Sequence, residues 1–390
     1  MRNPWEEEQL QRLYLQAVQP IRGVFPSASC SKWRTWKRAV ENLFSHFPQF
    51  VWLLSARRKK AEALIAASVN GGVGDLIRFN AFFVSLVQQY PNVKIDIYTA
   101  HPAAKFVFAK LPGVRVIAPE RLYPWFAKRY DAYFNMGQIV VPTFHTDVFP
   151  MPCLRKVADE WSAIVSKHWQ QYQRVFFPEL IRLAEQRNWN FLEMLGRTGG
   201  LVGVGQARAK IYVKSSPNPL AGKKYITFNT GWNKNDKLPP GVARHTKCWP
   251  EEHWRAWVRL FRKAYPHIDV VQLGENNAPR IVEANTTLLG RTTLNEVSSV
   301  LKDSLLHVDC DCGLMHLSYA LGVPAVILFG PTNGSYLTYP NQVVLLAPRC
   351  GNCWHLTRTW DYQCPLYPQP VCMSSITPQM LQDTVAKQLK

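Results

Sequence analysis

The sequence predicts an α/β protein with two domains, each built around a parallel sheet. Short apolar segments alternate with amphipathic helical segments along most of the chain, the pattern of strand–helix units that pair in parallel. With 390 residues, 47% of them hydrophobic, the chain is long enough to fill two cores of ordinary size. The composition changes at the Ser- and Pro-rich segment 214–219, where we expect the linker.

The predicted elements follow from residue periodicity. Short apolar or alternating runs predict strands, and apolar residues three and four apart predict helices. Pro91 ends the first long helical run, and Gly322-Val323-Pro324 ends the last. In chain order, we expect the end of a helix and a strand at 61–69, a helix at 76–89, a strand at 93–98, a helix at 103–110, a strand at 114–117, mostly helix over 156–195, a strand at 225–229, a helix at 251–264, a strand at 269–273, a strand at 305–308, a helix at 314–321 and a strand at 325–329.

These elements divide the chain into three parts. We expect a basic helical N-terminal extension at 1–60, an N-terminal domain at 61–213 and a C-terminal domain at 223–390 that ends in a Cys-rich segment, 350–372.

The net charge of +19 indicates an anionic partner. The N-terminal extension alone holds 11 Lys/Arg against 4 Asp/Glu. Two interpretations of it stay open: an amphipathic helix on an anionic membrane, or a helix packed on the next domain with a solvated basic face. No nucleic-acid-binding motif is visible, and we expect no nucleic-acid partner. The helical apolar stripe consists of Trp33, Trp36, Val40, Leu43, Phe44 and Phe47.

The chain shows no segment for crossing a membrane. No run approaches the ~18 apolar residues that a spanning helix needs. The first residues, MRNPWEEE, lack the charged-then-apolar order of a signal peptide. We expect a cytoplasmic protein, free or at the inner face of the cytoplasmic membrane.

The most informative stretch is 305–332, which has the pattern strand, tight turn, helix, strand. The turn lies at Asp311-Cys312-Gly313, and the helix that follows would point unpaired backbone N–H groups and a positive dipole end outward. Asp311 and His316 flank that opening. Such a helix start suits a phosphate, although by shape alone any capped strand–helix–strand unit has the same pattern.

A glycine-rich turn, Asn70-Gly71-Gly72-Val73-Gly74-Asp75, follows the first predicted strand. It is not a dinucleotide fingerprint, because Ile77 stands where the third glycine is required, which makes a dehydrogenase a poor interpretation. A carboxylate at Asp75 can serve as a general base or as a helix N-cap, and both interpretations stay open.

A third segment runs through Lys247-Cys248-Trp249-Pro250-Glu251-Glu252. Pro250 suits the first turn of a helix, and the two glutamates complement its N-terminus. Lys247 lies on the loop just ahead of that helix.

Together these segments resemble glycosyltransferase family 9, the heptosyltransferase-like enzymes. The string D-x-G-x-M-H-L-x-x-A-L-G-V-P-x-V-x-L-F-G-P-T, from Asp311 to Thr332, is similar to the family's nucleotide-sugar-binding motif. K-x-W-P-E-x-x-W, from Lys247, and the G-x-G-D turn are similar to two further family segments. The resemblance implies the GT-B fold, two Rossmann-like domains facing across a cleft, with the acceptor on the N-terminal domain and the donor on the C-terminal one.

The resemblance also implies roles for particular residues. Asp75 matches the catalytic base, and Lys247 the lysine that contacts the donor diphosphate. Cys312 departs from the Ser or Thr that the family commonly has, and a thiol is a poorer hydrogen-bond donor than a hydroxyl. The glycine-rich loop near the acceptor is represented by Gly72 and Gly74. The implied donor-binding residues are Thr230, Lys247, Glu275, Asp311, Cys312, Gly313 and His316.

The implied reaction is inverting transfer of a sugar, most simply heptose from ADP-heptose, to a lipopolysaccharide core or another cell-surface glycan. No metal or cofactor is required, because Lys247 and the helix N-terminus can stabilise the leaving diphosphate. Two alternatives stay open: a nucleotide-sugar epimerase of the same architecture, and a non-catalytic basic binding module.

Four cysteines gather in the Cys-rich segment: Cys350, Cys353, Cys364 and Cys372. Four thiolates within 23 residues of a cytosolic chain can hold one tetrahedral Zn or Fe ion. Their arrangement resembles an iron-binding finger of many family 9 members. Because the spacing is not that of a standard zinc ribbon, unligated thiols remain the alternative.

Overall fold

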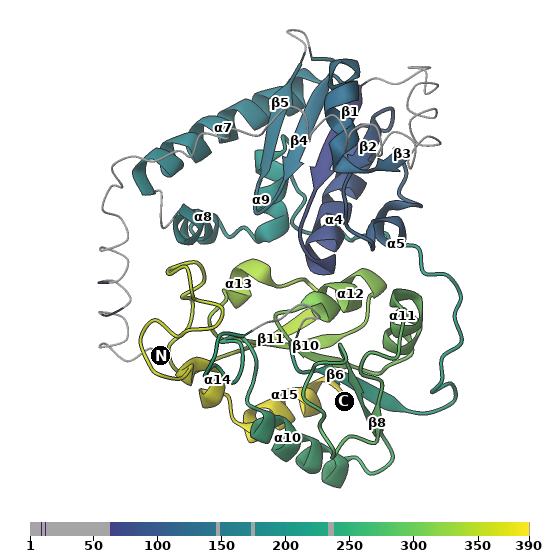
Figure 1. Cartoon of the computed structure of the whole chain (residues 1–390), viewed down its shortest axis with the longest axis vertical. Coiled ribbons are helices and arrows are strands. Elements are labelled where there is room, and N and C mark those ends of the chain that lie inside the picture. The colour runs from purple at the N-terminus through teal and green to yellow at the C-terminus, as the bar shows by residue number, and fades with distance from the viewer. Residues whose placement is uncertain are drawn as a thin grey trace.

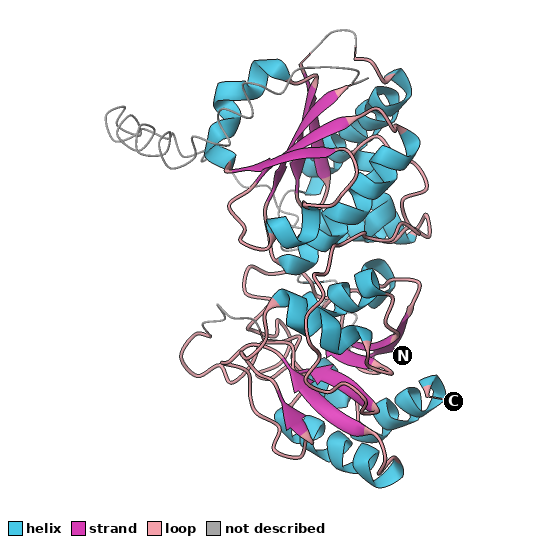
Figure 2. Ribbon diagram, turned by 90° about the vertical axis from the view of Figure 1, so that its right-hand side faces the viewer, coloured by secondary structure: helices cyan, strands magenta, loops and turns pink. Residues whose placement is uncertain are grey.

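The computed structural model describes residues 63–145, 149–172, 176–232 and 238–389, and in the N-terminal extension only Gln9 and Arg12. The predicted amphipathic helix of that extension lies outside the described residues. The predicted fold class is confirmed: two α/β domains, each around its own sheet, lie one above the other in Figures 1 and 2.

The N-terminal domain has a five-stranded sheet in the order β3-β2-β1-β4-β5. The first four strands are parallel, and β5 runs antiparallel to β4 at the edge. The strands are β1 (Leu64–Val69), β2 (Lys94–Tyr98), β3 (Val114–Ala118), β4 (Ala132–Met136) and β5 (Val140–Phe144). The helices are α4 (Val73–Gln89), α5 (Ala104–Phe108), η1 (Glu120–Leu122), α6 (Tyr123–Phe126), η2 (Ala127–Arg129), α7 (Pro152–Tyr172), α8 (Phe176–Glu185) and α9 (Phe191–Thr198).

Strand β1 shows why this sheet has two covered faces. Its six residues are all buried, and successive side chains point to opposite faces. Ile65 and Ala67 pack into the core that contains α4 and α9. Leu64 and Ala66 pack with Leu122 of η1 on the other face.

The C-terminal domain has a six-stranded parallel sheet in the order β11-β10-β9-β6-β7-β8. Helices α11 and α12 cover one face, and α10 and α15 cover the other. The strands are β6 (Tyr225–Asn229), β7 (Asp269–Leu273), β8 (Thr286–Thr287), β9 (His307–Cys310), β10 (Ala325–Phe329) and β11 (Gln342–Leu346). The helices are α10 (Glu251–Ala264), α11 (Leu294–Lys302), α12 (Gly313–Leu321), α13 (Gly334–Leu337), α14 (Val371–Ser375) and α15 (Pro378–Gln388).

The two domains meet through α4 and α12, and one apolar cluster runs from α4 and α9 into α12 and α13. The chain that leads into the linker is fixed to both domains. The side chain of Asn80, which is fully buried in α4, hydrogen-bonds the backbone N–H and C=O of Lys210. On the other side, Lys214 N donates to Asn295 of α11.

Candidate active site between the domains

Helix α12 begins without a side-chain cap and with no acidic residue in its first turn. It follows the buried strand β9, as the sequence predicts. A Cβ added at Gly313, the first helical residue, would meet no heavy atom of the described residues within 4 Å. The start of α12 therefore has open space in front of N–H groups that favour an anion.

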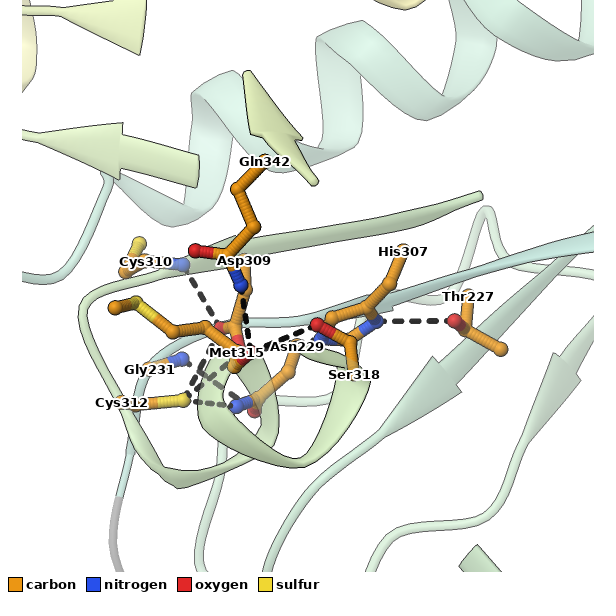
Figure 3. A network of polar contacts seen from close by, with 10 residues as sticks. All are labelled: Thr227, Asn229, Gly231, His307, Asp309, Cys310, Cys312, Met315, Ser318 and Gln342. Carbon is orange, nitrogen blue, oxygen red and sulfur yellow. Dashed lines mark hydrogen bonds and ion pairs between the residues drawn. The ribbon is translucent and has the colours of Figure 1, made fainter. Parts of the chain in front are cut away.

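A buried network lies beneath this helix start (Figure 3). The carboxylate of Asp309, fully buried at the end of β9, accepts hydrogen bonds from Cys310 N at 2.8 Å and from Cys312 Sγ at 3.0 and 3.1 Å. Burial raises the pKa of Asp309, while its bond to His307 opposes that rise. The turn that leads into α12 is thus held by the carboxylate below it.

The same network fixes the thiol of Cys312. Asn229, at the end of β6, donates to Cys312 Sγ at 2.8 Å. Burial raises the pKa of Cys312 well above its ordinary value, and the neighbouring Asp309 carboxylate adds to the rise. Cys312 is therefore a neutral thiol committed to the protein interior, which leaves the backbone at this position for a donor contact.

His316 lies at the boundary of the two domains. Its Nδ1 is 2.6 Å from the hydroxyl of Tyr339, and its ring lies so close to Gly74 of α4 that a Cβ there would collide with it. Burial lowers the pKa of His316 well below its ordinary value, and the cations Arg78 and Lys247 lower it further. The structure therefore holds a neutral imidazole here, and position 74 requires glycine for close packing.

The glycine-rich turn places Asp75 in the first turn of α4. Gly71 has φ +127°, and a Cβ there would collide with the Asp75 carboxylate. Asp75 Oδ2 accepts a hydrogen bond from Gly72 N at 2.9 Å, and Oδ1 pairs with Arg78 one turn later. The Asp75 side chain is 27% exposed. It serves as a helix cap, and each oxygen keeps a lone-pair site because a carboxylate has about four.

Arg78 is a functional candidate that the sequence reasoning missed. Its side chain is 9% exposed, and its guanidinium lies 4.0 Å from the ring centre of Phe191 in α9. Burial acts to lower its pKa, but Asp75, Tyr339 and Asp311 outweigh burial and raise it. The signal was available: an Arg three residues after Asp75 on a helix can reach its carboxylate.

The remaining donor-side residues follow the C-terminal ends of the parallel strands. Thr230 follows β6 and is buried, and its hydroxyl has no hydrogen-bond partner among the described residues. Glu275 follows β7 through Gly274, which has φ +137°. Lys247 lies near α12, since its charge lowers the pKa of Cys310, Cys312 and His316. Thr230, Lys247 and Glu275 therefore lie on the carboxyl side of the sheet, where α12 begins.

A cavity of about 800 Å³ opens between the domains beside Tyr339. Its walls come from the start of α9, the chain after α9, and the loop after α13. Polar and aromatic side chains line it, among them Trp189, Asn190, Arg197 and Gln206. Tyr339 lines this cavity and also bonds His316, which places the cavity next to the helix starts.

The four cysteines predicted to bind metal are neighbours in the structure. Burial raises the pKa of Cys353 well above its ordinary value, and Cys372, Cys364 and Cys350 each raise it further. Burial, followed by Cys350, raises the pKa of Cys372 to about 12. Among the described residues, however, no three His, Cys, Asp or Glu side chains converge closely enough to hold an ion. The thiol chemistry fits a metal, and the geometry shown does not form a coordination site.

Comparison with known proteins finds a family match within the C-terminal domain. The family model "Glycosyltransferase family 9 (heptosyltransferase)" matches residues 221–357. Lipopolysaccharide heptosyltransferase 1 of Escherichia coli K12 is 36% identical over 117 residues, which cover 28% of this chain and 36% of the relative. The Pseudomonas aeruginosa protein of the same name is 32% identical over 160 residues, covering 36% and 43%. The chain thus matches less than half of the length of these relatives, and the predicted resemblance to the family is confirmed.

Solved structures extend the similarity to both domains. The E. coli ADP-heptose lps heptosyltransferase II has a TM-score of 0.51 at 16% identity, covering 83% of this chain and 98% of that one. The iron-containing dodecameric glycosyltransferase TibC of enterotoxigenic E. coli H10407 has a TM-score of 0.58 at 15% identity, covering 84% and 78%. At these identities the similarity shows the fold, and it confirms the predicted GT-B architecture. In the described part of the chain, no helix is long and apolar enough to cross a membrane.

Proposed function

We propose that this chain, whose residues 221–357 form a glycosyltransferase family 9 domain, transfers a sugar from a nucleotide-sugar donor to a glycan acceptor with inversion at the anomeric carbon. One observation carries the proposal: the uncapped start of α12 contacts the start of α4, so that a donor phosphate at one lies beside the carboxylate of Asp75 on the other. The two helices come from different domains, which suits a reaction between two substrates.

In this proposal the donor diphosphate binds at Gly313, in front of the N–H groups of α12. Asp311 and His316 flank it, and the backbone of Cys312 contributes in place of its buried thiol. The free hydroxyl of Thr230 and the carboxylate of Glu275 contact the rest of the nucleotide at the neighbouring strand ends. Gly72 keeps the acceptor side of the site clear of a side chain, while Gly74 allows His316 to pack against the start of α4.

Asp75 acts as the general base. It takes the proton from an acceptor hydroxyl as that oxygen attacks the anomeric carbon and the bond from that carbon to the diphosphate oxygen breaks. The contacts with Gly72 N and Arg78 orient the carboxylate, and its exposed fraction of 27% leaves it accessible to a substrate. The sugar is transferred with inverted configuration because the acceptor oxygen attacks one face of the anomeric carbon and the nucleoside diphosphate leaves from the opposite face.

Lys247 and the N-terminus of α12 stabilise the charge that grows on the leaving nucleoside diphosphate. A preorganised cation and helix dipole in a partly buried site are strong stabilisers of developing charge. Because His316 is held neutral, Lys247 supplies the cation on the C-terminal side of the site. We propose that these groups support the transfer without a catalytic metal or cofactor.

For the donor we propose an ADP-activated heptose, because the curated relatives carry the name lipopolysaccharide heptosyltransferase and a structure of TibC, at a TM-score of 0.57, was solved with ADP-D-beta-D-heptose. For the acceptor we propose a lipopolysaccharide core or another cell-surface glycan. The cavity beside Tyr339 has aromatic and amide walls of the kind that bind sugars, and it provides room for part of such an acceptor.

The test is a transfer assay with purified protein, a panel of nucleotide sugars and an acceptor extract. We expect sugar to move from ADP-heptose to the acceptor, and thermal shifts with the donor alone, since a ligand of the native state stabilises it. Isomerised donor in the absence of acceptor would indicate an epimerase instead. Absence of donor binding in calorimetry would indicate a non-catalytic module.

We also propose peripheral association with an anionic membrane, where a lipid-linked acceptor would be found. The net charge of +19 supports it. Co-sedimentation with vesicles tests it: binding to vesicles with anionic lipid and not to neutral vesicles is expected, and equal recovery with both would contradict it.

We propose that the cysteine cluster holds one Zn or Fe ion in a structural role. The effect of the neighbouring thiols on the pKa values of Cys353 and Cys372 supports this proposal, and the neighbour TibC is described as iron-containing. Elemental analysis should find about one ion per chain, and Cys353→Ser should release it and lower stability. Metal-free protein whose stability chelators do not change would refute this role.

A further inference from the structure

The Cys-rich segment and the Lys247 loop, residues 244–248, are more than 100 residues apart in sequence and lie in contact. The sequence motifs suggest two separate units, one for a metal and one for phosphate. The hydrogen bonds between them indicate instead that the Cys-rich segment supports the Lys247 loop.

Thr246, next to Lys247, is the centre of the contact. Its backbone N–H donates to the carbonyl oxygen of Asp361 at 2.9 Å, and its hydroxyl donates to the carbonyl oxygen of Trp360 at 2.7 Å. His245 Nδ1 lies 3.1 Å from the same Asp361 oxygen. Thr246 is 2% exposed. Both hydrogen-bond donors of this buried residue, just before Lys247 in the chain, therefore bind the Cys-rich segment.

Arg244 fixes the C-terminal side of the Lys247 loop, at Cys248. Its guanidinium donates to the carbonyl oxygen of Cys248 at 2.6 Å, and it also donates to Ser374 Oγ of α14 at 3.0 Å. The residues on both sides of Lys247 are thus fixed to the chain that carries the cysteine cluster.

We infer that the tail segment 360–374 is a positioning element for Lys247, and that Thr246 is the positioning residue through which it acts. This inference rests on the proposed role of Lys247 at the donor diphosphate. A flexible lysine gains catalytic value when its backbone is fixed, because a misplaced charge stabilises the transition state less. The cysteine cluster then has a function beyond stability. It fixes the tail segment 360–374, which in turn fixes the Lys247 loop.

Thr246→Val tests the inference, because it removes the hydroxyl and keeps the size. We expect turnover to fall about tenfold with a smaller loss of ADP affinity, since misplacement affects the charge that matters most in the transition state. Thr246→Ser keeps the hydroxyl and should restore most of the turnover. The matched control is Thr384→Val in α15, where the hydroxyl also donates to a backbone carbonyl, that of Met380 at 2.8 Å. It should leave turnover unchanged.

A double-mutant cycle separates positioning from general stability. If Thr246 acts through Lys247, Thr246→Val should lower turnover in the wild-type background and have little further effect in a Lys247→Ala background. Equal losses in both backgrounds would overturn the inference, as would a Thr246→Val variant with unchanged turnover. If Lys247→Ala itself leaves both ADP binding and turnover unchanged, the proposed function of Lys247 fails first.

The cysteine cluster supplies a second measurement. Cys353→Ser should lower turnover more in the wild-type background than in the Lys247→Ala background, in parallel with loss of bound metal in elemental analysis. A Cys353→Ser variant that loses the metal and melts earlier, yet keeps full turnover, would show that the tail does not position the loop.

Discussion

The starts of α4 and α12 are two versions of one local structure. Each follows a buried parallel strand through a tight turn, and the two helices are in contact across the domain boundary. The start of α4 has Asp75 in its first turn, which accepts from Gly72 N and pairs with Arg78. The first turn of α12 has no acidic residue and its start has no side-chain cap, and among the described residues open space lies in front of Gly313.

The difference shows how one local structure can serve two substrates. An acidic residue in the first turn stabilises a helix and repels an anion, so the start of α4 disfavours phosphate and, in the proposed reaction, carries the base. Without such a residue, α12 leaves its N–H groups for a ligand. The cost in helix stability is offset beneath α12 by the Asp309 network, which holds the turn from the inside.

The largest effect should come from closing the start of α12. Gly313→Val places a side chain in the open space, and we expect ADP binding to fall below detection in calorimetry while the fold stays intact. Gly137→Val, in the exposed turn after β4 where only Ile139 O lies 3.8 Å away, is the control and should bind ADP normally. Normal ADP binding by Gly313→Val would show that the phosphate binds elsewhere.

Removing the base from α4 should have the next largest effect. In Asp75→Asn we expect turnover to fall ~10²-fold or more, the scale of general-base removal, with donor affinity retained because the donor binds at the other helix. Single-turnover transfer and calorimetry with ADP measure the two quantities. A variant with near-normal turnover would reduce Asp75 to the helix cap that the structure shows it to be.

Lys247→Ala sharpens the comparison on the donor side. Its charge matters more as the leaving group develops, so we expect turnover to fall about tenfold further than ADP affinity. The same two assays apply. If ADP affinity fell while turnover at saturating donor stayed unchanged, Lys247 would contribute to ground-state binding alone.

The smallest effect concerns His316, where the two helices touch. Its pKa is lowered in the folded protein, so the unfolded chain, with an ordinary pKa near ~6.5, takes up the proton first. Protonation therefore favours unfolding, and stability should decrease as the pH falls below ~6.5. In His316→Gln, thermal melts between pH 7 and 5 should show a weaker decrease than in the wild type. If the pH dependence of the melting temperature were the same in the variant, groups other than His316 would cause the decrease in stability.

Strongly periodic segments could be predicted from the sequence. In the unit from β9 to β10, the apolar strand β10 lies at its predicted residues and α12 begins one residue earlier than predicted, while β9 lies two residues later than the predicted strand at 305–308. The β4–β5 hairpin was not predicted, because Ala132–Met136 is short and β5 contains Pro142, which is tolerated only at a sheet edge.

The parts of the site that depend on contacts between domains could not be predicted. Gly74 looked like part of a loop for the acceptor, but the collision of any side chain there with His316 of the other domain is visible only in three dimensions. Thr246 donates to the backbone carbonyls of residues 360 and 361. Because every residue has a backbone carbonyl, no residue type in the sequence indicates these hydrogen bonds.

The hydrogen bonds of Thr246 also set an order of events during synthesis. Lys247 leaves the ribosome long before residues 360–374, and its loop cannot take its final shape until they arrive. Contacts over such sequence distances are costly to form early. A nascent or truncated chain that ends before residue 360 would thus contain the whole 305–332 motif and still lack a correctly placed lysine.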